Sequence, residues 1–119
     1  MRKFPTGATR NRADDKLDYE GFLCPLVLER YAQYMHGHRK QADGDLRDSD
    51  NWQKGIPRAE YVKSGWRHFF DWWKAHRQHR DPEEAICALL FNAMGYLHEH
   101  LKDKHTHARP NDSHTAYEG

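Results

Sequence analysis

Apolar residues recur at helical spacing in three segments of the 119-residue chain, and the strongest pattern lies in residues 58–77. Its stripe consists of Val62, Trp66, Phe69, Phe70 and Trp73. Apolar positions three and four residues apart are typical of one face of an amphipathic helix, so we predict a helix over this range. Because three of the four tryptophans lie in residues 64–73, we expect this stripe to form the centre of the core.

Two further helices are predicted on either side of this segment. The first of these has Pro25 near its first turn, where proline is favoured, and runs to about residue 40. Its apolar stripe is Leu23, Val27, Tyr31, Tyr34 and Met35. Residues 81–102 begin with Asp81, Pro82, Glu83 and Glu84, in the order of a capping residue, a first-turn proline and first-turn carboxylates. The stripe of this helix is Ile86, Leu89, Leu90, Ala93, Leu97 and Leu101.

The three patterns together predict an all-α fold, a small domain of three main helices. Large apolar side chains lie on more than one face of these helices. Three helices leave part of that surface uncovered, and we expect a homo-oligomer to complete the domain.

The polar residues beside these stripes allow two interpretations. Arg67, His68 and Asp71 lie close to large rings, either as the polar border of a core helix or as one wall of a ligand site. Asn92 lies in an apolar setting about two turns after Glu84. It is either a buried amide that ties helices together or a residue of the site, because a buried amide is costly unless it is hydrogen-bonded.

Residues 51–57, Asn-Trp-Gln-Lys-Gly-Ile-Pro, place a tryptophan and an isoleucine in a polar loop just before the central helix. Such a loop is expected to be anchored. One interpretation is a hydrophobic staple and turn that lead into the helix. The other is a wall of a nucleotide pocket, with Trp52 stacking on a base, Asn51 hydrogen-bonding and Lys54 facing phosphate.

The ends of the chain are polar. Residues 1–20 are predicted to be a basic, extended arm, either a frayed end or a strap in which Arg10 and Lys16 close over an anion. Residues 41–50 are predicted to be an exposed loop, and residues 103–119 a disordered tail. The helical domain itself is predicted to span residues 21–102.

Composition excludes several functional classes. The formal net charge of +1 provides no global field that would attract nucleic acid or a membrane surface. Cys24 and Cys87 lack metal-site spacing, which favours reduced thiols. No apolar run approaches the roughly 18 residues of a membrane span. We therefore expect a cytoplasmic protein without direct nucleic-acid or membrane binding.

Several motifs together resemble a known family. These are Gly7-Ala8-Thr9-Arg10 with Lys16, the segment from Asn51 to Pro57, Arg67-His68, and Glu84 followed by Ala88 and Asn92. Over residues 6–101 the chain resembles the small phage and prophage family named for a dATP/dGTP diphosphohydrolase amino-terminal domain, which is related to the all-α MazG-like nucleotide pyrophosphohydrolases. The resemblance places the protein in the host cytoplasm if it is phage-encoded.

The resemblance implies a helical, usually oligomeric domain that binds a purine deoxynucleoside triphosphate. With Mg²⁺, or Mn²⁺, such a domain would cleave dATP or dGTP to the monophosphate and pyrophosphate. The candidate catalytic residues are His68, Asp71 and Glu84, and the candidate metal ligands are Glu84, Asp71 and Glu29. The candidate nucleotide-binding residues are Asn51, Trp52, Lys54, Arg67, Asn92, Arg10 and Lys16.

This sequence also departs from the MazG-like pattern. Those enzymes carry Glu-x-x-Glu on one helix and Glu-x-x-Asp on the next, because several carboxylates must hold Mg²⁺ against a triphosphate. Here the first predicted helix offers only Glu29, and Cys87 and Ala88 stand where the aspartate is expected. Two alternatives to hydrolysis therefore remain: a noncatalytic phage protein that sequesters a nucleotide or a nucleotide-derived signal, and a protein-interaction module.

Overall fold

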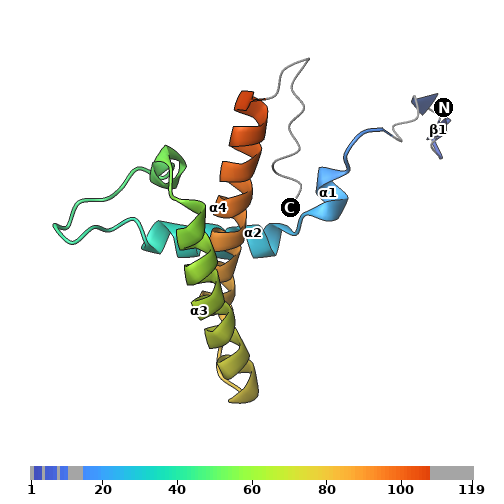
Figure 1. Cartoon of the computed structure of the whole chain (residues 1–119). Coiled ribbons are helices and arrows are strands. Elements are labelled where there is room, and N and C mark those ends of the chain that lie inside the picture. Colours follow the sequence, from blue (N-terminus) through green and yellow to red (C-terminus); the bar gives the residue numbers. More distant parts are fainter. Residues whose placement is uncertain (1, 4, 8, 11–14, 108–119) are drawn as a thin grey trace.

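The computed structural model describes residues 2–3, 5–7, 9–10 and 15–107. Its centre is an antiparallel hairpin of two long helices, α3 (Arg58–Arg77) and α4 (Glu83–His107), which lie side by side (Figure 1). A third helix, α2 (Pro25–Gly37), crosses this hairpin and packs on α4. The predicted all-α fold with three main helices is confirmed.

Short elements precede the main helices. The strands β1 (Arg2–Lys3) and β2 (Thr9–Arg10) pair antiparallel, and the one-turn helix α1 (Tyr19–Phe22) follows. Asp18 caps α1, because its Oδ1 accepts a hydrogen bond from Gly21 N at 2.9 Å. A 3₁₀ turn, η1 (Asn51–Lys54), leads into α3. In the described residues of the amino-terminal arm, a short antiparallel strand pair therefore precedes a helical turn.

Local sequence explains where the helices begin and end. α3 has the predicted bounds. α4 begins after Asp81, whose Oδ1 accepts from Glu83 N at 2.9 Å, as expected of a capping residue. α2 ends at Gly37 instead of residue 40, because His38 turns back and its Nδ1 lies 2.8 Å from Tyr34 O.

α4 continues to His107, beyond its predicted end at residue 102. Arg58 explains this extension, because its guanidinium bonds both the carboxylate of Asp103 and the carbonyl of Glu99. The start of α3 thus holds the last turns of α4. Residues 108–119 of the predicted tail lie outside the described residues. No helix in the described part of the chain is both long and apolar enough to cross a bilayer.

The prediction that the apolar stripe of α3 forms the core is wrong. This α3 stripe consists of Val62, Trp66, Phe69, Phe70 and Trp73. Trp66 is 70% exposed, and the other members of the stripe are about half exposed. The face of α3 that packs on α4 is the neighbouring one, where Tyr61 and Ala75 are 3% and 2% exposed. On α4, Cys87, Ala88 and Asn92 are buried.

Small residues explain which face is buried. Gly65 of α3 lies against Asn92, since a Cβ added to Gly65 would stand 3.7 Å from the Asn92 Cβ. Gly95 of α4 receives the ring of Tyr61, and a Cβ at Gly95 would overlap that ring. Two helices approach closely only where their facing side chains are small, so the large rings of the α3 stripe are excluded from the contact.

The two cysteines are expected to differ in reactivity. Cys87 is 4% exposed and burial raises the pKa of its thiol, whereas Cys24 is exposed. Because the thiolate is the nucleophile, iodoacetamide should label Cys24 roughly tenfold faster or more in the native protein. Peptide mass spectrometry over a time course measures both rates, and labelling in denaturant, where the rates should converge, is the control. Equal rates in the native protein would contradict the buried position of Cys87.

Candidate functional site

A cavity of about 210 Å³ lies between the end of α2, the loop that follows it and η1. Its walls combine aromatic, cationic and amide side chains, among them Tyr34, His38, Arg39, Arg47, Asn51 and Trp52. The loop is closed by a backbone bridge between Lys40 and Leu46, which brings Arg47 back beside Arg39. Two of the predicted nucleotide-binding residues, Asn51 and Trp52, therefore share a cavity.

Trp52 both anchors η1 and faces this cavity. Its ring meets His98 of α4 edge to face, with centroids 4.8 Å apart, and meets Phe91 at 6.4 Å. His98 is partly buried, and its Nε2 has no hydrogen-bond partner among the described residues. The predicted anchoring of residues 51–57 is confirmed, and it coexists with a position in the cavity wall.

Backbone carbonyls hold the two arginines at the cavity. Arg39 Nε donates to Arg47 O at 2.7 Å, and Arg47 Nη1 donates to His38 O at 3.2 Å. Each guanidinium has five N–H groups, so most of them remain for an anionic ligand. The carboxylate of Asp48 also lines the cavity, so the wall is cationic with one opposing charge.

Tyr34 adds a donor to the same wall. Its ring lies 4.1 Å from that of His38, centroid to centroid, and the His38 ring is held in turn by the Tyr34 carbonyl. Burial, followed by the charge of Glu84, raises the pKa of Tyr34. The phenol therefore stays protonated at neutral pH and can donate its O–H to a ligand.

The predicted catalytic residues do not line this cavity. Within α3, His68 Nδ1 lies 4.0 Å from Asp71 Oδ2, and both side chains are partly exposed. Arg67 is exposed and approaches Ser64 Oγ at 3.4 Å. His68 and Asp71 thus form a solvent-accessible pair whose separation is longer than a hydrogen bond.

Glu84 is engaged by a cation instead of being grouped with other carboxylates. Arg30 of α2 donates from Nε to Glu83 Oε1 at 2.6 Å and lies 3.6 Å from Glu84 Oε1 through Nη2. The hydrogen bond to Glu83 raises the pKa of Arg30, which stays charged. This contact ties the middle of α2 to the start of α4.

The candidate metal ligands do not come together in one chain. Among the described residues, no three His, Cys, Asp or Glu side chains are grouped closely enough to hold a metal ion. A guanidinium beside Glu84 also disfavours a second cation there. Glu29, Asp71 and Glu84 therefore do not fit a preformed magnesium cage.

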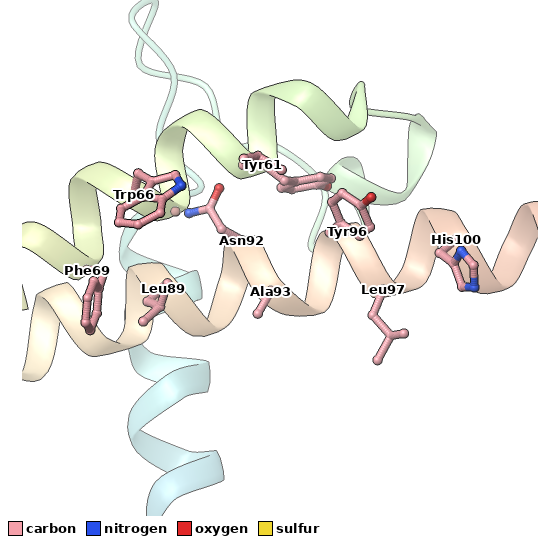
Figure 2. Close-up of a pocket in the computed structure, with 11 residues that line it drawn as sticks. Tyr61, Trp66, Phe69, Leu89, Asn92, Ala93, Tyr96, Leu97 and His100 are labelled. Atoms are coloured by element: carbon pink, nitrogen blue, oxygen red, sulfur yellow. The ribbon is translucent and has the colours of Figure 1, made fainter. Parts of the chain in front are cut away.

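Asn92 belongs to a different depression, the groove between α3 and α4 (Figure 2). The groove has a volume of about 740 Å³ and is lined mainly by apolar side chains. Asn92 is 5% exposed, and its Nδ2 donates to Ala88 O of its own helix at 2.7 Å. The amide thus fills space opposite Gly65, and this hydrogen bond does not tie the helices together.

The remaining predicted binding residues lie apart from both sites. Lys54 is exposed at the end of η1 and does not line the cavity, and Lys16 and Glu29 are exposed. Arg10 lies in β2, and its side chain falls outside the part of the chain that is described. The structure therefore supports Asn51 and Trp52 more directly than the other predicted contacts.

A family model described as "dATP/dGTP diphosphohydrolase, N-terminal" matches residues 6–109. The chain belongs to this family. No curated protein and no solved structure matches the chain. The match to the dATP/dGTP diphosphohydrolase amino-terminal family covers α2, η1, the α3–α4 hairpin and the cavity, whereas β1 lies outside it.

Of the residues that line this family member's cavity, the sequence predicted Asn51 and Trp52 as binding residues and missed the others, among them Tyr34, His38, Arg39 and Arg47. Residues 36–40 are rich in basic side chains, but such residues are also common at the carboxyl end of a helix, where the helix dipole favours cations. Only the return of the loop at Arg47 shows that Arg39 and Arg47 share one wall. A bridge across residues 40–46 has no clear signature in the sequence.

Proposed function

We propose that this chain is a nucleotide pyrophosphohydrolase-type domain that acts on purine deoxynucleoside triphosphates, converting dATP or dGTP to the monophosphate and pyrophosphate. The observation that carries the proposal is the cavity in which Asn51 and Trp52 meet Arg39 and Arg47. Membership of the dATP/dGTP diphosphohydrolase amino-terminal family supports the substrate class.

The aromatic part of the cavity suits a purine base. Stacking on an indole contributes about 1–3 kcal/mol per base, and Trp52 is held at a fixed angle by His98 and Phe91. The Asn51 amide and the Tyr34 O–H supply donors, and the amide carbonyl an acceptor, for the edge of a base. A cavity of about 210 Å³ accommodates the base and leaves the phosphates at its mouth.

The cationic part of the cavity suits the triphosphate. Guanidinium groups bind phosphate oxygens through paired N–H donors, and the Arg39 and Arg47 groups are already oriented by backbone carbonyls. A divalent cation would arrive as part of the substrate, because Mg²⁺ usually travels on triphosphate oxygens with few protein carboxylates. Lys54 and Arg67 are further exposed cations, but neither lines the cavity.

Hydrolysis requires a water molecule that attacks the α-phosphorus while the bond to the bridging oxygen of the β-phosphate breaks. The His68–Asp71 pair on α3 is the candidate base for the proton of that water, although neither side chain lines the cavity of one chain. Glu84 is the second candidate, but its carboxylate faces Arg30.

Binding without turnover is the alternative function, and the position of Glu83 and Glu84 favours it. Both carboxylates face Arg30, so the start of α4 is used to hold α2. The cavity would then sequester a nucleotide or a nucleotide-derived signal. It needs the same aromatic and cationic groups but no activated water.

The test is to incubate the purified protein with deoxy- and ribonucleoside triphosphates plus Mg²⁺ or Mn²⁺, and to follow products by chromatography and stability by thermal shift. Pyrophosphate release from dATP or dGTP that is lost in His68→Ala establishes the hydrolase. Thermal stabilisation without product supports the binding protein. Neither signal with any nucleotide contradicts both.

Arg47→Gln should weaken nucleotide binding without unfolding the protein. Arg47 lies on an exposed loop, and charge-assisted hydrogen bonds to phosphate contribute about 1.5–3 kcal/mol each, so the dissociation constant for dATP should rise roughly tenfold to a hundredfold. Calorimetric titration measures it. Lys40→Gln is the matched control, because Lys40 is an exposed cation of the same loop that does not line the cavity. Equal affinity of Arg47→Gln and wild type would contradict the phosphate role.

A further inference from the structure

One short segment lines much of the proposed nucleotide cavity. It contributes Arg47, Asp48, Ser49, Asn51 and Trp52. Within it, Asn51 N donates to Asp48 O at 3.0 Å, so the backbone folds into a tight turn. The turn places Asp48 beside Asn51, which directly precedes Trp52 in η1. A carboxylate, an amide and an indole therefore share one part of the cavity wall.

The guanidinium groups of the cavity are held toward the end of α2. Arg39 Nε donates to Arg47 O at 2.7 Å, and Arg47 Nη1 donates to His38 O at 3.2 Å. Both arginines are therefore kept beside the residues that follow α2, where they attract phosphate oxygens. A nucleotide whose phosphates meet the arginines and whose base stacks on Trp52 presents the edge of its base to the turn.

Asp48 brings a carboxylate into a wall whose other described side chains are cationic or uncharged. Among the described residues, no lysine, arginine or histidine forms an ion pair with it. An ionised carboxylate accepts hydrogen bonds and donates none. It therefore attracts the N–H groups of a bound base and repels a ring nitrogen that carries a lone pair.

The two purines differ in what they offer to a carboxylate. Guanine presents two adjacent donors, N1–H and the N2 amino group, which match the two oxygens of a carboxylate and form charge-assisted hydrogen bonds. Adenine presents the lone pair of N1 beside the N6 amino group, so one carboxylate oxygen faces a lone pair. The O6 atom of guanine needs a donor, and the Asn51 amide supplies one in the same part of the wall.

We propose that the cavity prefers guanine to adenine, and that Asp48 determines this preference by accepting hydrogen bonds from N1–H and the N2 amino group of the base. The Asn51 amide then donates to O6 while Trp52 stacks on the ring. The preference rests on the proposed nucleotide function and narrows its substrate from the two purine deoxynucleoside triphosphates to dGTP.

Calorimetric titration of the full chain with the α,β-methylene analogues of dGTP, dATP and dITP tests the preference. The methylene group blocks cleavage, so binding is measured without turnover. Wild type should bind the dGTP analogue roughly 10–100-fold more tightly than the dATP analogue. The dITP analogue keeps N1–H but lacks the N2 amino group, so its affinity should lie between the two. Equal affinity for the dGTP and dATP analogues, or tighter binding of dATP, would overturn the proposal.

Asp48→Asn should remove the preference, because it replaces one acceptor oxygen by a donor in a side chain of the same size. The dissociation constant for the dGTP analogue should rise roughly tenfold or more. That for the dATP analogue should stay the same or fall, since an amide can pair with both N1 and the N6 amino group of adenine. A dGTP preference that persists in Asp48→Asn would overturn the role of this residue.

Asp50→Asn is the matched control, because Asp50 is an exposed carboxylate of the same segment that does not line the cavity. It should keep the wild-type ratio of the two affinities. Circular dichroism of both variants checks that the helices are retained.

The titrations also distinguish the other outcomes. If Asp48 contacts the sugar instead of the base, Asp48→Asn should weaken the dGTP and dATP analogues equally, which would overturn the proposal. If wild type binds none of the analogues, the nucleotide function fails and the base preference fails with it. If wild type binds the dGTP and dATP analogues equally, the nucleotide function stands and the base preference alone is overturned.

Discussion

Gly95→Ala is expected to lower the free energy of unfolding by about 1–3 kcal/mol, although alanine is the better helix former by about 1 kcal/mol. The added methyl group would overlap the ring of Tyr61, which is 3% exposed between α3 and α4. The two helices must therefore separate, or the ring must leave its place against Gly95 and turn into the groove that it lines. Either response removes the close contact between Tyr61 of α3 and Gly95 of α4.

Urea unfolding at fixed protein concentration measures this effect. Gly37→Ala is the control, because a Cβ at Gly37 meets nothing within 4 Å and the residue lies in the last turn of α2. It should leave stability unchanged or raise it by up to about 1 kcal/mol.

A double-mutant cycle identifies the cause. In a Tyr61→Leu background the overlap disappears, so the cost of Gly95→Ala should fall toward zero. An unchanged cost there would mean that Gly95 serves a purpose other than admitting the ring.

Asn92→Asp is expected to destabilise the protein at neutral pH by about 2–4 kcal/mol. The new carboxylate would be 95% buried, and it would face the Ala88 carbonyl to which the Asn92 amide now donates. An ionised carboxylate in that position loses its hydration and gains a repulsive contact. Asn92→Leu, of similar volume and uncharged, should cost less than about 1.5 kcal/mol.

The loss in Asn92→Asp should depend on pH in a defined direction. Burial raises the pKa of the introduced carboxyl above its unfolded value of about 3.9, so between these two pKa values the folded state binds more protons. Stability relative to wild type is therefore greatest below about pH 4 and falls as pH rises through the folded pKa. Unfolding measured across this range gives the curve.

An exposed amide provides the control for Asn92→Asp. Gln33→Glu on α2 introduces the same charge at an exposed position and should change stability by less than about 0.5 kcal/mol at any pH. A flat pH profile for Asn92→Asp would show that position 92 is accessible to water in solution.

The candidate site could be predicted only in part. Asn51 and Trp52 are neighbours in sequence, so their shared position in the cavity wall follows from one anchored loop. Arg39 and Arg47 are separated by a loop that is closed by backbone hydrogen bonds. No residue pattern in the sequence predicts this closure. His68 and Asp71 are near each other because they are three positions apart on one helix, but they do not line the cavity.

Sequence alone determined the all-α fold, the bounds of α3 and the capping residue before α4. Helical periodicity and the Asp81 cap are local properties of the chain. It did not determine which face of α3 is buried. Hydrophobicity predicted that the rings of the α3 stripe would be buried. The two helices instead approach each other where the facing residues are small, and these residues are Gly65, Ala75, Ala88 and Gly95. Close packing between elements, which no single segment encodes, therefore decided that the rings remain outside and are available to a partner.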